Sequence, residues 1–172
     1  SPDSFSFKIS PPYSNILTKK IVDECDRQPH SGFNYWFVDL PNRVYISKIA
    51  SSSSSVALLS RCGRLFSWGE HSGHPTNPRT PTPIQALLSH GITDVAAGAS
   101  HFICCTQEGE AFIWGKGDYC LGQGDEIKSL ATPSPLQLLN ITAVAATSKS
   151  SFAVSGKSCY IWGSKSLNGS SE

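Results

Sequence analysis

Apolar residues near the middle of the chain come in short runs that are bounded by glycine. Three such runs follow one another, at residues 92–97, 102–106 and 111–114. Runs of this length between glycines favour buried β-strands, because amphipathic helices need longer periodic stretches. The link between the second and third runs ends in Gly109, which can adopt the positive φ that a tight hairpin requires. The pattern predicts a three-stranded antiparallel meander.

The same pattern recurs on both sides of this meander. Downstream, the residues from Ile141 repeat those from Ile92 after 49 positions, and Trp162-Gly163 repeats Trp114-Gly115 after 48. Upstream, residues 46–69 form a further copy that also ends in Trp-Gly. A recurring unit of this kind indicates a repeat architecture.

A fourth element follows a long loop in two of the copies. Residues 82–87 (TPIQAL) match residues 134–139 (SPLQLL). Four strands in about 50 residues is the arithmetic of a propeller blade. We therefore predict an all-β fold of four-stranded antiparallel blades, with about two and a half to three blades forming an incomplete ring.

The repeats divide the chain into four segments. We place the first repeat at residues 45–90, the second at 91–140 and a truncated third at 141–172. Residues 1–44 form an irregular N-terminal segment in which residues 33–40 (FNYWFVDL) are dense in aromatic residues. This segment is interpreted as a degenerate blade or as ring-closing strands, and the alternative is an aromatic segment that docks a partner.

The central copy resembles the repeats of the regulator of chromosome condensation family. The resemblance is carried by residues 97–101 (AGASH), by the turn at residues 108–110 (EGE), by Trp114-Gly115 and by residues 121–124 (LGQG). It implies blades of a seven-bladed β-propeller. The flanking copies depart from the family pattern, because serine-rich segments stand where glycine and histidine are expected.

A set of residues is expected to be structural. A large aromatic at a fixed blade position fills the wedge between neighbouring sheets, so the three repeated tryptophans are expected at equivalent buried positions. The histidine of the central copy is expected to fix a turn through a backbone hydrogen bond. The full structural set is Trp68, Gly69, Gly98, His101, Gly109, Trp114, Gly115, Trp162 and Gly163.

The loops between third and fourth strands are expected to bind partners. They span residues 70–82 and 116–134, they are the longest polar loops of the repeats, and equivalent loops of stacked blades share one face. The candidate contact residues are Glu70, His71, His74, Arg79, Asp118, Tyr119, Asp125 and Glu126. We interpret the His71-to-His74 spacing as part of a solvated loop, since two imidazoles without further ligands do not make a metal site.

Composition narrows the function classes. Net charge is +1, pI is about 7.6 and the 14 basic residues are dispersed. The sequence therefore has no cluster of basic residues to bind a phosphate backbone, and chromatin is an unlikely partner. No apolar run is long enough to span a membrane. The six cysteines show no C-x-x-C pair, which favours reduced thiols in an intracellular protein, cytoplasmic or nuclear. We expect no metal and no cofactor.

These observations predict a non-enzymatic protein–protein interaction module that is part of a larger regulatory protein. No pattern places a nucleophile beside a base and an oxyanion donor. The resemblance implies an alternative function, guanine-nucleotide exchange on a Ran-like small GTPase. The expected partners are another protein, for example a small GTPase, and a second copy of the chain or further blades that complete the ring.

Overall fold

The computed structural model describes residue 40 and residues 44–163. The chain separates into two units, Ser1–Val44 and Tyr45–Glu172, and all described strands belong to the second. The predictions for the N-terminal segment, including its aromatic stretch, therefore fall outside the described residues apart from positions 40 and 44.

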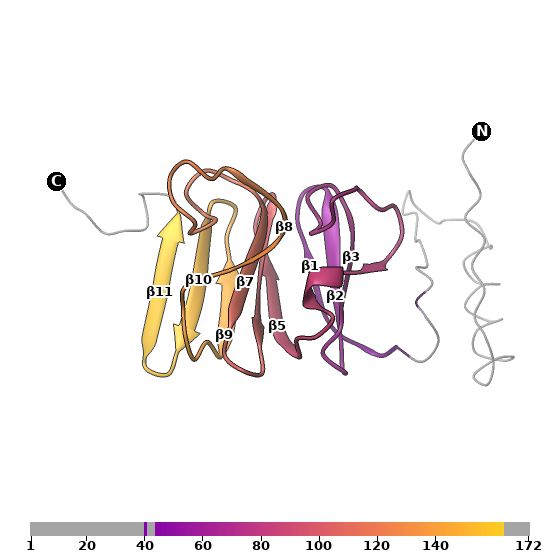
Figure 1. Ribbon diagram of the computed structural model, residues 1–172, viewed down its shortest axis with the longest axis horizontal. Helices are drawn as coiled ribbons and strands as arrows, with labels where there is room; N and C mark the ends of the chain where they lie inside the picture. The colour runs from indigo at the N-terminus through magenta and orange to yellow at the C-terminus, as the bar shows by residue number, and fades with distance from the viewer. Residues whose placement is uncertain (1–39, 41–43, 164–172) are drawn as a thin grey trace, which may run out of the picture. The chain divides into compact units, whose positions relative to one another are not determined.

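The second unit is built from three antiparallel sheets that follow one another along the chain (Figure 1). The first contains β1 (Ile46–Ser51), β2 (Ser55–Ser60), β3 (Leu65–Gly69) and β4 (Thr82–Pro83). The second contains β5 (Ile92–Ala97), β6 (His101–Thr106), β7 (Ala111–Lys116) and β8 (Ser129–Pro135). The third contains β9 (Ala143–Ala146), β10 (Ser150–Ser155) and β11 (Ser158–Gly163). Strands pair in sequence order within each sheet, so the predicted all-β blade architecture is confirmed.

The Trp-Gly motif occupies the same register in all three blades. Trp68 lies opposite Val56, Trp114 opposite Phe102, and Trp162 opposite Ser151. The glycine that follows each tryptophan has a positive φ, of 99°, 111° and 124° along the chain. A Cβ at any of the three would lie 2.3–2.4 Å from a backbone oxygen of the neighbouring strand connection. Glycine is thus required at this position both by conformation and by space.

The fourth strand of the first blade is shorter than the sequence predicts. The expected strand over residues 82–87 is wrong beyond Pro83, because residues 85–87 form a 3-10 turn, η1. The N–H of Ile84 still donates to the Leu65 carbonyl at 3.1 Å, after which the chain leaves the sheet. The turn directs Ile84 and Leu87 into the core, where they are 1% and 2% exposed.

The fourth strand of the second blade lies earlier than predicted. Strand β8 covers Ser129–Pro135, whereas the sequence prediction placed it at residues 134–139. The loop before it accordingly ends at residue 128 and not at residue 134. Proline is tolerated in this strand because β8 is the outermost strand of its sheet, where a missing N–H faces away from the ladder.

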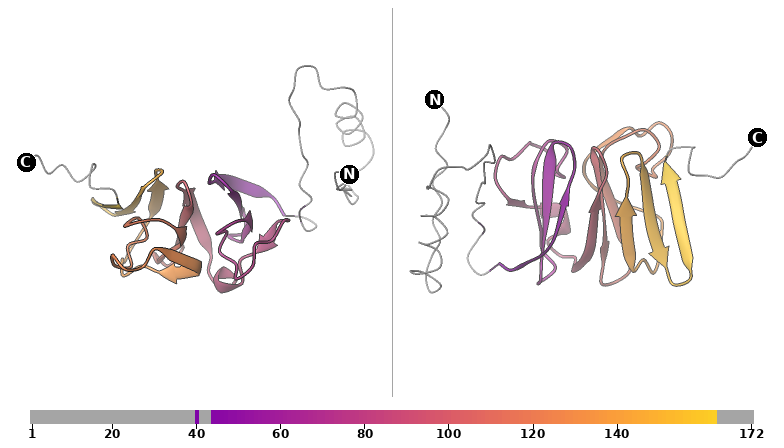
Figure 2. Two further views of the ribbon diagram at one scale, coloured as in Figure 1. Left: turned by 90° about the horizontal axis from the view of Figure 1, so that it is seen from above. Right: turned by 180° about the vertical axis from the view of Figure 1, so that it is seen from behind.

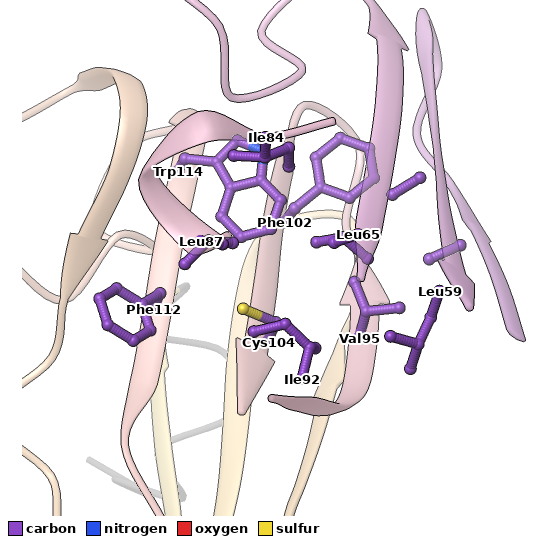
Figure 3. Close-up of a cluster of buried hydrophobic side chains, with 12 residues drawn as sticks. Leu59, Leu65, Ile84, Leu87, Ile92, Val95, Phe102, Cys104, Phe112 and Trp114 are labelled. Atoms are coloured by element: carbon purple, nitrogen blue, oxygen red, sulfur yellow. The ribbon is translucent and has the colours of Figure 1, made fainter. Parts of the chain in front are cut away.

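Neighbouring blades pack through two clusters of buried side chains. The cluster between the first and second blades includes Leu65, Ile84, Val95 and Trp114 (Figure 3). The cluster between the second and third blades includes Ile103, Ile113, Leu121 and Val144, among others. Cys104 belongs to the first cluster and Cys105 to the second, which confirms that these neighbours point to opposite faces of β6.

Backbone hydrogen bonds repeat between blades at both ends of the sheets. Ile92 donates to the Gly63 carbonyl at 3.0 Å, and the equivalent Ile141 donates to Gly109 at 2.9 Å. At the opposite end, Ser53 donates to the Ala99 carbonyl at 2.9 Å. The views in Figure 2 show the three sheets standing side by side, as these bonds require. Equivalent backbone hydrogen bonds therefore join each blade to the next.

The three tryptophans are equivalent in register but not in burial. Trp114 is fully buried, whereas Trp68 and Trp162 are each half-buried. Trp114 and Trp162 each face the preceding blade, since Trp114 packs with residues of the first blade and Trp162 packs with residues of the second. Side chains alternate along a strand, so Trp68 points away from the second blade and no described blade covers it. The expectation of equivalent buried positions is therefore wrong in burial, because no described blade covers Trp68 and Trp162 is only partly buried against the second blade.

Candidate partner-binding face

Two long loops emerge at the same end of the sheets, the upper end in Figure 1. We call residues 70–81 the His71 loop and residues 117–128 the Tyr119 loop. Each begins where a third strand ends, and its start is bonded to the turn between the first two strands of the same blade. Glu70 donates to the Ser54 carbonyl at 3.2 Å, and Lys116 donates to the Ser100 carbonyl at 2.7 Å. The loops and these turns together form the candidate face.

Both loops place a bulky residue in the left-handed region at the same position. The φ angle is 55° at His71 and 63° at Tyr119, and each residue follows an acidic one. Residues other than glycine seldom adopt such angles, which cost on the order of 1 kcal/mol each. A conformation of this kind persists only where the surrounding structure enforces it.

The turn at Tyr119 is especially tight. The N–H of Cys120 donates to the Asp118 carbonyl at 2.8 Å, so one residue closes the turn. A three-residue turn whose central residue has a positive φ is a classic γ-turn, which is rare and strained. Its central side chain nevertheless lies outside the core, because Tyr119 is 56% exposed. The loop thus presents a ring to solvent on a backbone that does not adopt this shape by itself.

Three side chains below the turn form a closed hydrogen-bond ring. The Ser151 hydroxyl donates to the Cys120 carbonyl at 2.8 Å, which uses its only proton. The contact of 2.9 Å between His101 Nε2 and Ser151 Oγ is therefore an N–H donated by the imidazole. The unprotonated Nδ1 of His101 is then left to accept the Cys120 thiol, whose sulfur lies 3.5 Å away. Ser151 belongs to the third blade, so the ring joins two blades.

The Cys120 carbonyl receives a second donor from the third blade. Trp162 Nε1 donates to it at 2.9 Å. Cys120 and the following Leu121 are each 1% exposed, so the segment after Tyr119 is fully buried. The backbone carbonyl after the strained residue is fixed by two hydrogen bonds, and both donors come from the neighbouring blade.

The His71 loop is fixed by a similar relay that lies within its own blade. Ser67 Oγ donates to the Ser72 carbonyl at 2.6 Å, and His74 Nε2 lies 2.9 Å from the same hydroxyl. By the same proton count, His74 donates its N–H to Ser67. Ser72 and Cys120 each come directly after the left-handed residue of their loop. In both loops, a serine that contacts a histidine therefore bonds the carbonyl that follows the left-handed residue.

Burial keeps both histidines neutral. Loss of solvation lowers the pKa of His101 to about 4 and also lowers the pKa of His74. Burial likewise raises the pKa of the Cys120 thiol, so the group remains an S–H donor. Neutral imidazoles suit the relays, because each ring must donate through Nε2 without bringing a charge into the core.

The structure separates the predicted contact residues into two groups. Glu70, Arg79, Asp118, Tyr119, Asp125 and Glu126 are exposed, and His71 is half-buried. His74 is 9% exposed and bonded to Ser67, so the prediction that it lies in a solvated loop is wrong. The exposed set carries both signs of charge, and Lys128 lies 3.8 Å from Asp118 on the surface.

His101 has a different role from the one expected. Its ring nitrogens contact the Ser151 hydroxyl and the Cys120 thiol, whereas a hydrogen bond to the backbone of a turn was expected. Gly98 is needed for this, because a Cβ there would lie 2.1 Å from the His101 ring. The partner Ser151 was visible in the sequence only as part of a serine-rich departure from the family pattern. Its position opposite Trp162 is the signal that points to it.

In the first blade a Ser-Gly pair takes the place of the Leu-Gly pair of the second blade. No Leu-Gly pair follows Trp68, yet Gly73 lies against the Trp114 indole as Gly122 lies against the Trp162 indole. A Cβ would approach the indole nitrogen to 2.9 Å at Gly73 and 2.8 Å at Gly122. Ser72-Gly73 is therefore the counterpart of Leu121-Gly122 in packing.

Other kinds of site find no support in the part of the chain that the structure describes. Residues 44–163 contain no group of three histidine, cysteine or acidic side chains arranged to hold a metal ion. The five cysteines among them, at positions 62, 104, 105, 120 and 159, are free thiols. No helix in the described residues has the length and hydrophobicity needed to cross a membrane.

The sequence profile of the family described as "Regulator of chromosome condensation (RCC1) repeat" matches residues 92–119. This segment holds the second blade from β5 to the Tyr119 turn. Residues 92–119 of this chain therefore form a repeat of the regulator of chromosome condensation type.

Two curated proteins are similar to this chain over part of its length. Ras guanine nucleotide exchange factor C of Dictyostelium discoideum is 30% identical over 99 residues, which are 54% of this chain and 6% of that protein. Ultraviolet-B receptor UVR8 of Arabidopsis thaliana is 36% identical over 111 residues, 60% of this chain and 25% of the receptor. The chain thus spans at most a quarter of these two relatives.

The solved structure of Prp20p from Saccharomyces cerevisiae shares the fold. It is described together with its binding properties to Gsp1p and histones. It superimposes with a TM-score of 0.60 at 20% identity, over 69% of this chain and 31% of Prp20p. The three sheets of this chain therefore have the fold of the matched part of Prp20p.

Proposed function

We propose that this chain is a protein-binding module whose partner contacts the end formed by the His71 loop and the Tyr119 loop. The observation that carries the proposal is Tyr119, an exposed aromatic side chain on a strained turn that is fixed from below by buried hydrogen bonds. Such pre-organisation lowers the entropy that is lost on binding. Tyrosine is also among the side chains enriched at the centres of protein interfaces.

The charges around Tyr119 favour a protein partner over a nucleic acid. Asp118, Asp125 and Glu126 lie in the same loop and are exposed, with Lys128 beside Asp118. Carboxylates repel a phosphate backbone, whereas a mixture of both signs is suited to electrostatic matching with another protein surface. This chain matches only a part of each larger relative, which fits the proposal of a binding module.

The binding face can be tested with a double variant. We expect Asp118→Ala with Tyr119→Ala to reduce capture of specific partners by tenfold or more, while the melting temperature changes by no more than about 2 °C. The control is Glu108→Ala with Lys157→Ala, two exposed residues in the turns at the opposite end of the sheets. Immobilised proteins are exposed to cell extract, and captured proteins are quantified by mass spectrometry. Equal losses for both double variants would reject this face.

A second candidate function is nucleotide exchange on a Ran-like small GTPase. It is favoured by the similarity to a protein named as a Ras guanine nucleotide exchange factor and by the shared fold with Prp20p, which is described as binding Gsp1p. The test follows release of a fluorescent GDP analogue from a purified Ran-type GTPase. Acceleration at or below equimolar amounts of this chain would make exchange the function, and release at the intrinsic rate would leave the binding module.

A further inference from the structure

We infer that Ser151 of the third blade is a positioning residue for the Tyr119 loop of the second blade, so that the partner-binding surface of one repeat is set by its neighbour. This inference rests on the proposed function of the Tyr119 loop. It concerns a residue that makes no contact with solvent, since Ser151 is 0% exposed. Its effect on binding must therefore pass through the loop.

The first step of the argument is the strain at Tyr119. A classic γ-turn with φ of 63° relaxes unless both of its ends are held. The start of the loop is held by its own blade, through the bond of Lys116 to Ser100. The other side of the turn is held at the Cys120 carbonyl, which accepts hydrogen bonds from Ser151 and Trp162 of the third blade.

The second step is the orientation of the Ser151 hydroxyl. A free hydroxyl rotates, but here the imidazole N–H of His101 occupies one lone pair of Oγ at 2.9 Å. The hydroxyl proton is thereby directed to the Cys120 carbonyl at 2.8 Å. The Cys120 thiol closes the ring on His101, so all three groups are fixed together.

The third step is the contrast with the His71 loop. There the carbonyl that follows the left-handed residue, on Ser72, is bonded by Ser67 of the same blade. The first blade therefore holds its own loop, whereas the second blade depends on the third. This difference provides a matched pair of variants, because Ser67 and Ser151 are both fully buried and both bond one loop carbonyl.

The experiment compares Ser151→Ala with Ser67→Ala by hydrogen–deuterium exchange of the whole chain. Ser151→Ala is expected to raise exchange in residues 117–128 at least fivefold and to leave residues 70–81 within twofold of wild type. Ser67→Ala should produce the reverse pattern. Both variants leave a buried carbonyl with a lost donor, so a purely structural loss of stability would raise exchange similarly in both loops. That equal response would overturn the inference.

A milder variant covers the case in which Ser151→Ala does not fold. Trp162→Phe removes the other donor to the Cys120 carbonyl at a half-buried position. It is expected to raise exchange in residues 117–128 by a smaller factor than Ser151→Ala and to spare residues 70–81. An unchanged Tyr119 loop in this variant would also count against the inference.

A binding measurement separates this inference from the proposed function. The probes are those proteins that wild type captures and the Asp118→Ala, Tyr119→Ala variant does not. Ser151→Ala should weaken their capture at least threefold, and Ser67→Ala should weaken it less. If exchange rises in the Tyr119 loop while capture is unchanged, the positioning role stands and the partner surface lies elsewhere. If exchange is unchanged, the positioning role fails whatever the capture shows.

Discussion

The Asp94 carboxylate of the second blade accepts the backbone N–H of Val144 in the third blade at 3.2 Å. The other oxygen of the same carboxylate lies 2.5 Å from Lys48 Nζ in the first blade and accepts the N–H of Val95 at 2.9 Å. One side chain thus connects the first strands of all three blades. No motif marked Asp94, because its counterparts in the other blades are Lys48 and Ala143.

Replacing Asp94 should uncouple the blades. We expect Asp94→Ala to lower the free energy of unfolding by about 2 kcal/mol, because a charged acceptor of two backbone N–H groups is lost in a largely buried position. Lys48→Ala serves as the control and should cost less than about 1 kcal/mol, since the lysine is 45% exposed and its ion pair is screened. Urea unfolding followed by circular dichroism measures both. Equal costs would show that the ion pair, and not the backbone contacts, supplies the stabilisation.

The strands of this fold were predictable because the pattern that produces them is local. Short apolar runs and glycine at hairpin turns marked the strands, and the repeated Trp-Gly motif located the third strand of each blade from sequence alone. The fourth strands were predicted less well. Their match rested on a Ser/Thr-Pro pair, and that pair makes up the whole of β4 and the end of β8, instead of beginning a longer strand.

The anchoring of the candidate face was not predictable from local patterns. His101 and Ser151 are 50 residues apart, and nothing in either repeat alone indicates that they meet. The same holds for Trp162 and the Cys120 carbonyl, because a backbone acceptor leaves no mark in the sequence. The positions of Asp118 and Tyr119 on a polar loop could be predicted, whereas the strained turn centred on Tyr119 depends on contacts from the next blade.

The outer flank of the third blade is expected to mediate association. In the second blade, Ile103 and Ile113 lie side by side in the sheet and are fully buried beneath the third blade. Their counterparts Phe152 and Ile161 pair in the same register, but Ile161 is 46% exposed and Phe152 is half-buried. We therefore expect self-association at tens of micromolar, detected by light scattering, because an apolar sheet face of this kind is seldom left open in water.

A pair of lysine substitutions tests this flank. Ile161→Lys should shift the mass toward that of a single chain, since burying an unpaired ammonium is costly. Leu139→Lys is the control, because Leu139 is 76% exposed and lies outside the strands. It should leave the association unchanged. A wild-type chain that remains monomeric without aggregation over the same range would contradict the assembly expected here.

Stability should decline as the pH falls from about 6.5 to about 4. The His101 imidazole takes up a proton near pH 6.5 in the unfolded chain but only near pH 4 in the folded one, because burial lowers its pKa. The unfolded chain therefore binds more protons in this pH interval. The contribution of His101 to the free energy of unfolding is fully present above pH 6.5 and is lost as the pH falls to 4. A difference of one pKa unit between the folded and unfolded chain corresponds to about 1.4 kcal/mol, so His101 contributes about 3 kcal/mol to the loss of stability. His74 adds to it in the same direction, since its pKa is also lowered.

The variant His101→Gln separates this contribution from the acid titration of other groups. Glutamine keeps an N–H donor for Ser151 and does not titrate, so the variant should be less stable than wild type at pH 7 but should lose less stability between pH 6.5 and pH 4. His90→Gln is the control, because the His90 imidazole contacts the exposed Glu110 and takes no part in the loop relays. Both variants and wild type are measured by urea unfolding at matched ionic strength. If His101→Gln kept the full wild-type slope, the buried ring between the second and third blades would not be the titrating element.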